Sequence, residues 1–333
     1  MTMPAMSRVT VTSLEAHVQP KRPKSPQRRI VRRIVDGVLL LDKPQGLSSN
    51  HALQAARRLL NAAKAGHTGT LDPMATGLLP LTFGEATKFS QMLLDADKTY
   101  EAVVQLGVET DSGDAEGRVV ATHPVAVTEA AVVEVLSRFR GDIEQVPPMY
   151  SALKRDGKAL YEYAREGVEL EREARRVTIH ALELLAFDGD RFGIRVACSK
   201  GTYIRTLAMD IGAALGCGAH LCGLRRTRIG AFDVSAAVTL ERLETAPADE
   251  RDALLAPADA LVREFDVVVL SAEEATWLLQ GRTLRLARQE APGPVRAYGP
   301  QGFLGLAQWQ ADGALAPRRL IATCADVPVN ASA

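Results

Sequence analysis

The apolar positions of the chain recur with two different periods, and they predict both strands and helices. The apolar run Gly37-Val-Leu-Leu-Leu41 is continuous, which favours a buried strand. After Ser48 and Ser49, either of which can cap a helix, apolar residues return every three or four positions and predict a helix to about Ala63. The same reasoning predicts helices over 85–94, 128–139, 203–215 and 272–279. It predicts strands over 99–108, 118–122, 176–187, 192–198, 267–270, 295–298, 303–310 and 314–320.

The order of these elements indicates the fold class and the domains. Strands and helices are mixed without regular β-α-β alternation, which favours an α+β fold over a doubly wound parallel sheet. Alanine, proline and acidic residues dominate 244–259, so we expect a domain boundary near residue 250. The sequence therefore predicts a basic, disordered extension over 1–34, a first domain over 35–250 and a small, mostly β domain over 251–327.

Composition limits the class of protein further. A chain of 333 residues is long enough for two domains, and a hydrophobic content of 47% excludes general disorder. No run of about 18 apolar residues is present, so we expect no membrane span. The amino terminus lacks the apolar core of a signal peptide, and we therefore expect a cytoplasmic protein.

Charge is balanced overall but unevenly distributed. The chain has 40 basic and 40 acidic residues, so its formal net charge is zero. Eight of the basic residues lie within 1–35, where Glu15 is the only acid. Five more lie between Lys200 and Arg228, opposed only by Asp210. A neutral protein polarised in this way can still present a basic surface to RNA.

Neither the cysteines nor the acidic turn of the chain has the spacing of a metal site. Cys198, Cys217, Cys222 and Cys324 show no disulfide framework, and their spacing with His220 fits no zinc ligand pattern. The acidic turn 111–117 lacks the terminal glutamate of a calcium loop. We therefore expect reduced, mostly buried thiols and no metal.

The segment Ala65–Gly77 is the most informative stretch of the chain. It contains three glycines and presents one acid, Asp72, followed by Pro73, with no second acid nearby in the sequence. Glycines allow sharp turns and close approach to a ligand, so a rigidly presented carboxylate suits covalent chemistry. The alternative is that Asp-Pro only begins a turn or caps a helix.

The string from Gly66 to Pro80 resembles the catalytic loop of the TruB-type tRNA pseudouridine synthases. Further segments match that family in the same order, and they are 42–50, 84–88, 97–100, 146–154 and 199–205. The resemblance runs from about Asp36 to Phe232. It implies a catalytic domain with a mixed, largely antiparallel sheet flanked by helices and loops. More weakly, the C-terminal segment is similar to a PUA-type RNA-binding domain, with Gly281-Arg282 at the expected place.

The resemblance also implies an activity, the isomerisation of uridine 55 in the T loop of tRNA to pseudouridine. Nothing is oxidised or added in this reaction, so no cofactor is expected, in agreement with the absence of nucleotide-binding motifs from the sequence. By resemblance, Asp72 is the essential carboxylate, acting as nucleophile at C1′ or as base at C2′. Both routes stay open. Arg205 is the matching cation, which we expect to pair with Asp72.

Other residues are assigned to the substrate by the same resemblance. Tyr100 matches the tyrosine that stacks on the target base and assists proton transfer. Tyr203 and Leu224 match residues that line the pocket, and His67 matches a residue that stacks in the T loop after the base has left its stack. The candidate contacts to RNA phosphates are basic residues of these segments, namely Lys43, Lys64, Lys88, Lys154, Lys200, Arg225, Arg226 and Arg228.

Two other classes of function remain as alternatives. The first is an RNA-binding or chaperone protein without required catalysis, which could dispense with Asp72 and Tyr100. A chaperone role beside catalysis is also open. The second is a glycosidase-like hydrolase, which usually needs two carboxylates. For the enzyme we expect a monomer that binds the T stem-loop with its catalytic domain and the acceptor side with its C-terminal module.

Overall fold

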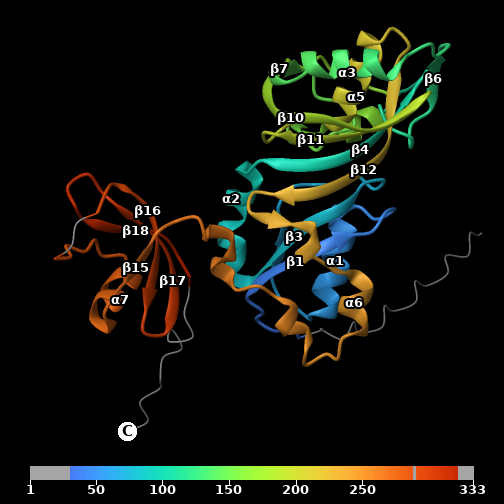
Figure 1. The fold of residues 1–333 in the computed structure, drawn as a ribbon. Coiled ribbons are helices and arrows are strands. Elements are labelled where there is room, and N and C mark those ends of the chain that lie inside the picture. The colour runs from blue at the N-terminus through green and yellow to red at the C-terminus, as the bar shows by residue number, and fades with distance from the viewer. Residues whose placement is uncertain (1–30, 288–289, 322–333) are drawn as a thin grey trace, which may run out of the picture. The chain divides into compact units, whose positions relative to one another are not determined.

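The computed structural model describes residues 31–287 and 290–321, so the predicted basic extension lies almost entirely outside the described residues. Within these ranges the chain forms a large mixed sheet, a separate four-stranded sheet and seven α-helices (Figure 1). No helix among the described residues is long and apolar enough to cross a membrane. The α+β fold class is confirmed.

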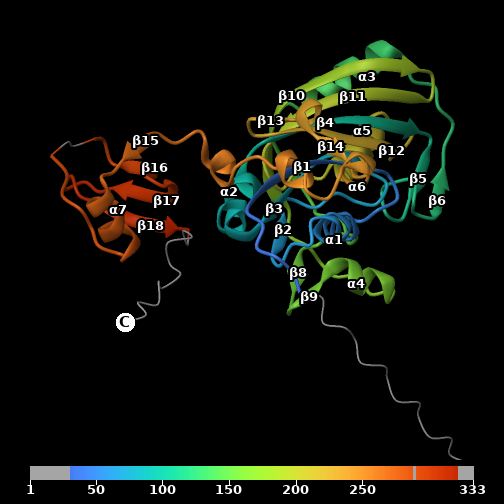
Figure 2. The same ribbon diagram turned by 90° about the horizontal axis from the view of Figure 1, so that it is seen from below.

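The large sheet has ten strands in the described part of the chain. Eight of them lie in the spatial order β14 (Val238–Thr239), β1 (Gly37–Lys43), β3 (Thr76–Phe83), β12 (Ala219–Ile229), β4 (Lys98–Leu106), β11 (Arg191–Cys198), β10 (Arg175–Asp188) and β7 (Gly141–Gln145). Two short strands lie outside this order: β2 (Ala65–His67) pairs with β3, and β13 (Phe232–Asp233) pairs with β12. The pairs β1–β14 and β3–β12 are parallel and the others are antiparallel. Figure 2 shows β4, β11 and β10 running side by side.

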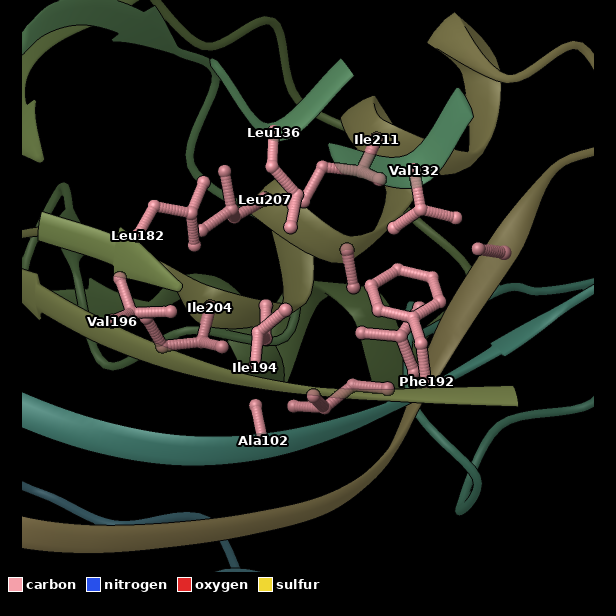
Figure 3. Packing of buried hydrophobic residues seen from close by; sticks show 14 of the residues in the cluster. Ala102, Val132, Leu136, Leu182, Phe192, Ile194, Val196, Ile204, Leu207 and Ile211 are labelled. Carbon is pink, nitrogen blue, oxygen red and sulfur yellow. The ribbon is translucent and has the colours of Figure 1, made fainter. Parts of the chain in front are cut away.

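One hydrophobic core lies between the sheet and two helices, α3 (Glu129–Arg138) and α5 (Ile204–Ala214). Leu136 of α3 and Ile211 of α5 pack over Phe192 and Ile194 of β11, and all four are at most 1% exposed (Figure 3). Burial of each such side chain stabilises the fold by about 1.5–3 kcal/mol. This core therefore fixes α5, whose first turn carries Arg205.

A second core lies against β1 and β3 and includes α1 (Ser49–Leu59) and α6 (Leu240–Thr245). Ser48 caps α1 by accepting a hydrogen bond from the His51 amide, as the sequence predicts. The helix ends four residues earlier than predicted, because Asn61 adopts a left-handed backbone with a φ of 49°. This core fixes Ser49, which lies beside the glycine-rich loop.

The smaller sheet has the order β15 (Val267–Val269), β16 (Gly293–Gly299), β17 (Gly302–Trp309) and β18 (Leu315–Leu320), and α7 (Ala272–Leu279) packs with it. Its core surrounds the fully buried Trp309. All five predicted elements of this segment are present. The domain boundary near residue 250 stays a prediction.

The remaining elements are short. The predicted helix over 85–94 is a 3₁₀ helix, η1 (Gly84–Phe89), followed by α2 (Ser90–Asp95). The predicted strand over 99–108 is interrupted at Gly107, and its end belongs to a separate hairpin of β5 (Val108–Thr110) and β6 (Val119–Thr122). A second hairpin and a helix are β8 (Lys154–Arg155), β9 (Lys158–Ala159) and α4 (Leu160–Arg165). Three more 3₁₀ helices are η2 (Val234–Ala236), η3 (Arg251–Leu254) and η4 (Ala258–Val262).

The sequence patterns miss two central strands, β3 and β12. Most of β3 is buried on both faces, so its apolar residues do not alternate with polar ones, and Gly77 and Pro80 disguise it further. β12 carries Arg225, Arg226 and Arg228, which the sequence presents as a basic surface. These two strands form the middle of the sheet, where the candidate site lies.

Candidate active site

The glycine-rich loop holds Asp72 between β2 and β3. The Ser49 hydroxyl accepts a hydrogen bond from the Leu71 amide at 2.7 Å and donates one to the Leu71 carbonyl at 3.0 Å. The Pro73 carbonyl accepts a hydrogen bond from the Gly46 amide at 2.8 Å, and the Ala75 amide donates to the Asp72 carbonyl at 3.1 Å. The backbone on both sides of Asp72 is therefore fastened to α1 and to the turn after β1.

Lys43 strengthens this arrangement from below the surface. Its side chain is fully buried, and its ammonium donates hydrogen bonds to the carbonyls of Pro44 at 2.9 Å, Leu47 at 2.6 Å and Pro73 at 3.4 Å. Burial lowers the pKa of Lys43 to about 8, against the opposing effect of the Asp72 carboxylate. In this structure the Lys43 side chain has no exposed surface, and its expected contact with the substrate stays a prediction.

Arg205 lies between two carboxylates. Its Nε is 3.0 Å from Asp72 Oδ2 and 3.5 Å from Asp114 Oδ2. Its two terminal nitrogens donate to the carbonyls of Ser112 at 3.0 Å and Tyr150 at 2.6 Å. The side chains of Arg205 and Asp114 are 5% and 6% exposed, whereas that of Asp72 is 35% exposed. The guanidinium is therefore fixed from behind, and of the two carboxylates Asp72 is the one that faces outward.

Asp114 is a functional residue that the sequence reasoning missed. Ser112 Oγ donates to Asp114 Oδ1 at 2.6 Å, and the Glu116 amide donates to the same oxygen at 3.1 Å. In the sequence, this aspartate was weighed only as part of a calcium loop. A second acid does lie near Asp72 in space, but Arg205 separates the two and Asp114 does not line the cavity. The two carboxylates thus lack the open gap that a glycosidase uses.

A cavity of about 260 Å³ opens beside Asp72. Its walls come from the glycine-rich loop, β4, β12, the start of α5 and the segments before α5 and after β7. The side chains predicted from the resemblance as catalytic or pocket-lining all reach it, and they are Asp72, Tyr100, Tyr203, Arg205 and Leu224. Lys98 and Arg226 also line the cavity.

The environment of Asp72 shifts its ionisation. Burial raises the pKa of Asp72, the Arg205 guanidinium lowers it, and the Asp114 carboxylate raises it, so that the pKa lies above its ordinary value. Ionised Asp72 is thus a partly buried carboxylate on which two cations act, Arg205 and, less strongly, Lys43. Such a carboxylate is a stronger base and nucleophile than an exposed one.

Tyr203 is placed by a residue from another strand. It precedes α5 and has no side-chain cap of its own. Gln145 of β7 instead binds the backbone of Tyr203. Its Oε1 accepts from the Tyr203 amide at 3.0 Å, and its Nε2 donates to the Tyr203 carbonyl at 3.3 Å. Gln145 therefore sets both the pocket wall and the start of the helix that carries Arg205.

His67 lies on β2 and does not line the cavity. Its ring is partly buried, and its Nδ1 is buried without a hydrogen-bond partner. Burial, with a smaller effect of Arg226, lowers the pKa of His67, which favours the neutral ring. The predicted stacking of His67 in an RNA loop stays a prediction.

The basic residues proposed as phosphate contacts differ in exposure and in their partners. Lys64, Lys154, Lys200 and Arg228 are exposed, although Lys200 pairs with Asp95 at 2.7 Å. Lys88 pairs with Glu85, and Arg225 forms a two-pronged ion pair with Asp42 at 2.7 and 3.0 Å. Arg226 is 1% exposed, so it is not a surface contact in this structure.

Cysteines play no part in the cavity. Cys198 and Cys217 are buried thiols and Cys222 is partly buried, while Cys324 lies outside the described residues. Burial raises the pKa of the Cys198 thiol to about 11. Within 31–287 and 290–321, no three His, Cys, Asp or Glu side chains gather in a group that could hold a metal ion.

Comparison with known proteins agrees with this geometry. Residues 57–204 match the model of the TruB family pseudouridylate synthase N-terminal domain, residues 205–263 that of the tRNA pseudouridylate synthase B C-terminal domain, and residues 267–321 that of the pseudouridine synthase II TruB C-terminal domain. A protein of Azoarcus sp. named tRNA pseudouridine synthase B is 70% identical over 297 residues, which cover 89% of this chain and 98% of that protein. Another of that name, from Aromatoleum aromaticum, is 66% identical and covers 90% and 97%.

Two solved structures share the fold. One, described as a Cbf5-Nop10-Gar1 complex, has 28% sequence identity and a TM-score of 0.61 and covers 82% of this chain and 78% of that one. The other, an archaeal box H/ACA sRNP Nop10-Cbf5 complex, has 26% identity and a TM-score of 0.64 and covers 86% of each chain. The high identity to the bacterial proteins, the three matching models and the arrangement of Asp72, Arg205 and Tyr100 lead to one conclusion. The chain belongs to the TruB family of pseudouridine synthases and is an isomerase.

Proposed function

We propose that this enzyme converts uridine 55 in the T loop of tRNA into pseudouridine, with Asp72 as its essential carboxylate. The observation that carries the proposal is the ion pair of Asp72 with the buried Arg205 at the rim of a small cavity that also contains Tyr100. The tRNA substrate is supported by relatives of up to 70% identity that are named for that activity.

The chemistry needs few groups. The N1–C1′ bond breaks and its electron pair leaves with the uracil. Asp72 either bonds to C1′ or removes the C2′ proton, and the uracil then turns and C5 bonds to C1′. In the first route Asp72 leaves C1′, and in the second it returns the proton to C2′. The C5 proton is removed and N1 takes up a proton, so the product is an isomer of the substrate.

Arg205 serves this chemistry by holding Asp72. Its guanidinium has four partners, of which only Asp72 faces the cavity, so its own position does not depend on the substrate. A cation fixed in this way favours the ionised carboxylate and restricts its direction. Of the assigned residues, Arg205 is therefore a positioning residue and Asp72 is the reacting group.

The size of the cavity bears on how the target uridine would enter it. A space of about 260 Å³ admits a single base rather than a helix, so the target uridine must leave its stack. Such flipping costs a few kcal/mol and is cheapest in a loop. Tyr100, Tyr203 and Leu224 would receive the base, and exposed basic residues such as Lys64 and Lys154 would contact phosphates. The C-terminal module would bind the acceptor side.

The test is conversion of unmodified tRNA transcript, with pseudouridine mapped by position. Wild-type enzyme should produce pseudouridine at position 55, and Asp72→Asn should produce none. Asp249→Asn is the matched control, because Asp249 is exposed and does not line the cavity. Product at another position, or equal product from Asp72→Asn, would overturn the assignment.

A tRNA-folding activity is separable from catalysis by the same variant. Asp72→Asn keeps the fold and the exposed basic residues, so it should still bind tRNA. If the protein also acts as a chaperone, Asp72→Asn should accelerate refolding of heat-denatured transcript as well as wild type does. Refolding that requires Asp72 would contradict a separate chaperone role.

A further inference from the structure

Arg226 is a buried cation in the wall of the cavity for which the chemistry above has no use. It lies on β12 directly opposite Tyr100 on β4 in the antiparallel register. Its side chain is only 1% exposed, and both residues line the cavity. Burial of a charged group is costly unless it has partners, so the partners of Arg226 indicate its role.

These partners are neutral. Arg226 Nε donates to the Leu78 carbonyl at 2.8 Å, and Nη2 donates to the Gly69 carbonyl at 3.1 Å. Tyr100 is its cross-strand neighbour, and both side chains line the cavity, so the guanidinium lies near the Tyr100 phenol. Among the residues that the structure describes, no carboxylate forms an ion pair with Arg226. Its charge is therefore uncompensated beside the Tyr100 phenol.

Two glycines near Asp72 lie close to Arg226. Gly69 of the loop adopts a φ of +87°, and a Cβ there would lie 3.5 Å from Arg226 Nη1. Gly77 of β3 adopts a φ of +100°, and a Cβ there would lie 2.3 Å from the Arg226 carbonyl oxygen. The first glycine thus allows close approach to the guanidinium and the second to the backbone of β12. Asp72 lies between these two glycines in the sequence and lines the same cavity as Arg226.

The chemistry of the two groups sets how they can interact. A guanidinium has donors and no acceptor, so in a contact with Arg226 the Tyr100 oxygen accepts. The hydroxyl hydrogen of Tyr100 can then point toward a substrate. Burial raises the pKa of Tyr100, and Arg226 opposes that effect more strongly than any other group; Cys198 and Asp72 raise the pKa further.

We propose that Arg226 is a positioning residue that orients the Tyr100 hydroxyl toward the substrate and stabilises its phenolate during proton transfer. This inference rests on the proposed function. The Tyr100 proton passes, directly or through solvent, to N1 of the detached uracil. The resulting phenolate, held by Arg226, then accepts the C5 proton after the C5–C1′ bond has formed. The electron pair of the C5–H bond returns to the uracil ring, and Tyr100 ends in its starting state.

A double-mutant cycle tests this role. The variants are Arg226→Met, Tyr100→Phe and the two together, assayed for kcat, KM and release of tritium from C5-labelled tRNA. Arg226→Met should lower kcat and tritium release by about tenfold or more, while KM changes less than about threefold. In the Tyr100→Phe background the same substitution should lower kcat by less than about twofold. Arg195→Met, at an exposed arginine of β11 outside the cavity, is the matched control and should leave kcat unchanged.

A purely structural role predicts a different result. If Arg226 only supports the Leu78 and Gly69 carbonyls, its substitution should reduce kcat equally with or without the Tyr100 hydroxyl, and equal losses would overturn the inference. Arg226→Lys keeps the buried charge and should recover part of kcat in the Tyr100 enzyme but not in Tyr100→Phe. If thermal unfolding shows no folded state for Arg226→Met, the same cycle is carried out with Arg226→Lys and Arg226→Gln, and the same comparison of kcat losses tests the inference. Failure of wild-type enzyme to form pseudouridine would instead refute the proposed function itself.

Discussion

Asp114 pairs with Arg205, which in turn pairs with Asp72. Substitution of Asp114 therefore tests whether the position of Arg205 affects the rate. Asp114→Asn should lower kcat by about tenfold or more, because a charge-assisted contact worth about 1.5–3 kcal/mol no longer restrains Arg205. Single-turnover rates of pseudouridine formation measure this effect, and tRNA affinity should stay within about threefold. Unchanged rates would show that Ser112 and Tyr150 alone suffice to hold the guanidinium.

The raised pKa of Asp72 has a consequence for the dependence of rate on pH. The proposed mechanism requires the ionised carboxylate, so kcat/KM should fall as pH decreases through the pKa of Asp72. Because burial raises this pKa, the acidic limb should lie above the value of about 4 that is usual for an aspartate. A pH–rate profile on labelled tRNA measures it. A limb at or below pH 4 would contradict the shift.

The same shift predicts the stability of Asp72→Asn. A carboxyl group with a raised folded-state pKa is held more strongly when protonated, so its ionised form disfavours folding at neutral pH. Arg205 retains Asp114, Ser112 and Tyr150 when Asp72 is neutralised. The variant should therefore unfold at the same temperature as wild type or higher at pH 7. A clearly lower Tm would show that the ion pair stabilises the fold.

At the scale of the element, the loop between β2 and β3 depends on support from β1 and β12. Lys43→Met removes the donor from three part-buried carbonyls, and an acceptor left without a partner away from water costs about 1–3 kcal/mol. We expect a decrease in the free energy of unfolding of at least about 2 kcal/mol, together with a loss of kcat through displacement of Asp72. Urea denaturation measures the first effect. Lys154→Met, at an exposed lysine, is the control for stability.

Gly77→Ala tests the close approach of the loop to β12. The added methyl would lie 2.3 Å from the Arg226 carbonyl oxygen, and the backbone φ of +100° is strained for any residue with a Cβ. The parallel pairing of β3 and β12 should loosen, which lowers both Tm and kcat. Gly157→Ala is a comparison with similarly positive φ and nothing within 4 Å, so backbone strain without a clash should cost less.

These elements also show where sequence patterns succeed. α3 and α7 bury one face and expose the other, so their apolar residues recur with the helical period. α5 is buried over most of its surface, but its apolar residues still recur every three or four positions. All three helices are predicted to within about two residues. β3 and β12 lie in the middle of the sheet, with neighbours on both edges. Buried residues follow one another in β3, and β12 contains a buried arginine, so neither strand shows the alternation of a half-exposed strand.

For the whole molecule, the net charge is zero, but exposed basic residues such as Lys64 and Lys154 are present, and we expect these to bind tRNA. Binding through two or more phosphates should weaken by about tenfold or more between 50 and 200 mM salt. The protein displaces counterions from the RNA when it binds, and their release is less favourable at higher salt concentration. Filter binding of Asp72→Asn to unmodified tRNA measures the slope without turnover. Affinity that does not change with salt would argue against phosphate contacts by the exposed lysines and arginines.

The family could be recognised from the amino-acid sequence alone, and so could the aspartate proposed to react and the arginine that pairs with it. These residues lie in short contiguous motifs, so their identity can be recognised without knowledge of what surrounds them. The types of most helices follow as well, because the period of burial is written into neighbouring positions. The expectations for Asp72, Arg205 and Tyr100 therefore needed no coordinates.

The roles of the other charged residues depend on how the chain folds. Lys43, Asp114 and Arg226 are separated by dozens of residues, and a sequence presents each as an ordinary surface charge or turn residue. Folding brings β1, the turn after β5 and β12 to the same loop and removes these side chains from water. Burial depends on which distant segments pack together, and it makes Lys43 a support for the loop, a turn aspartate a partner of Arg205, and a basic strand residue a neighbour of Tyr100.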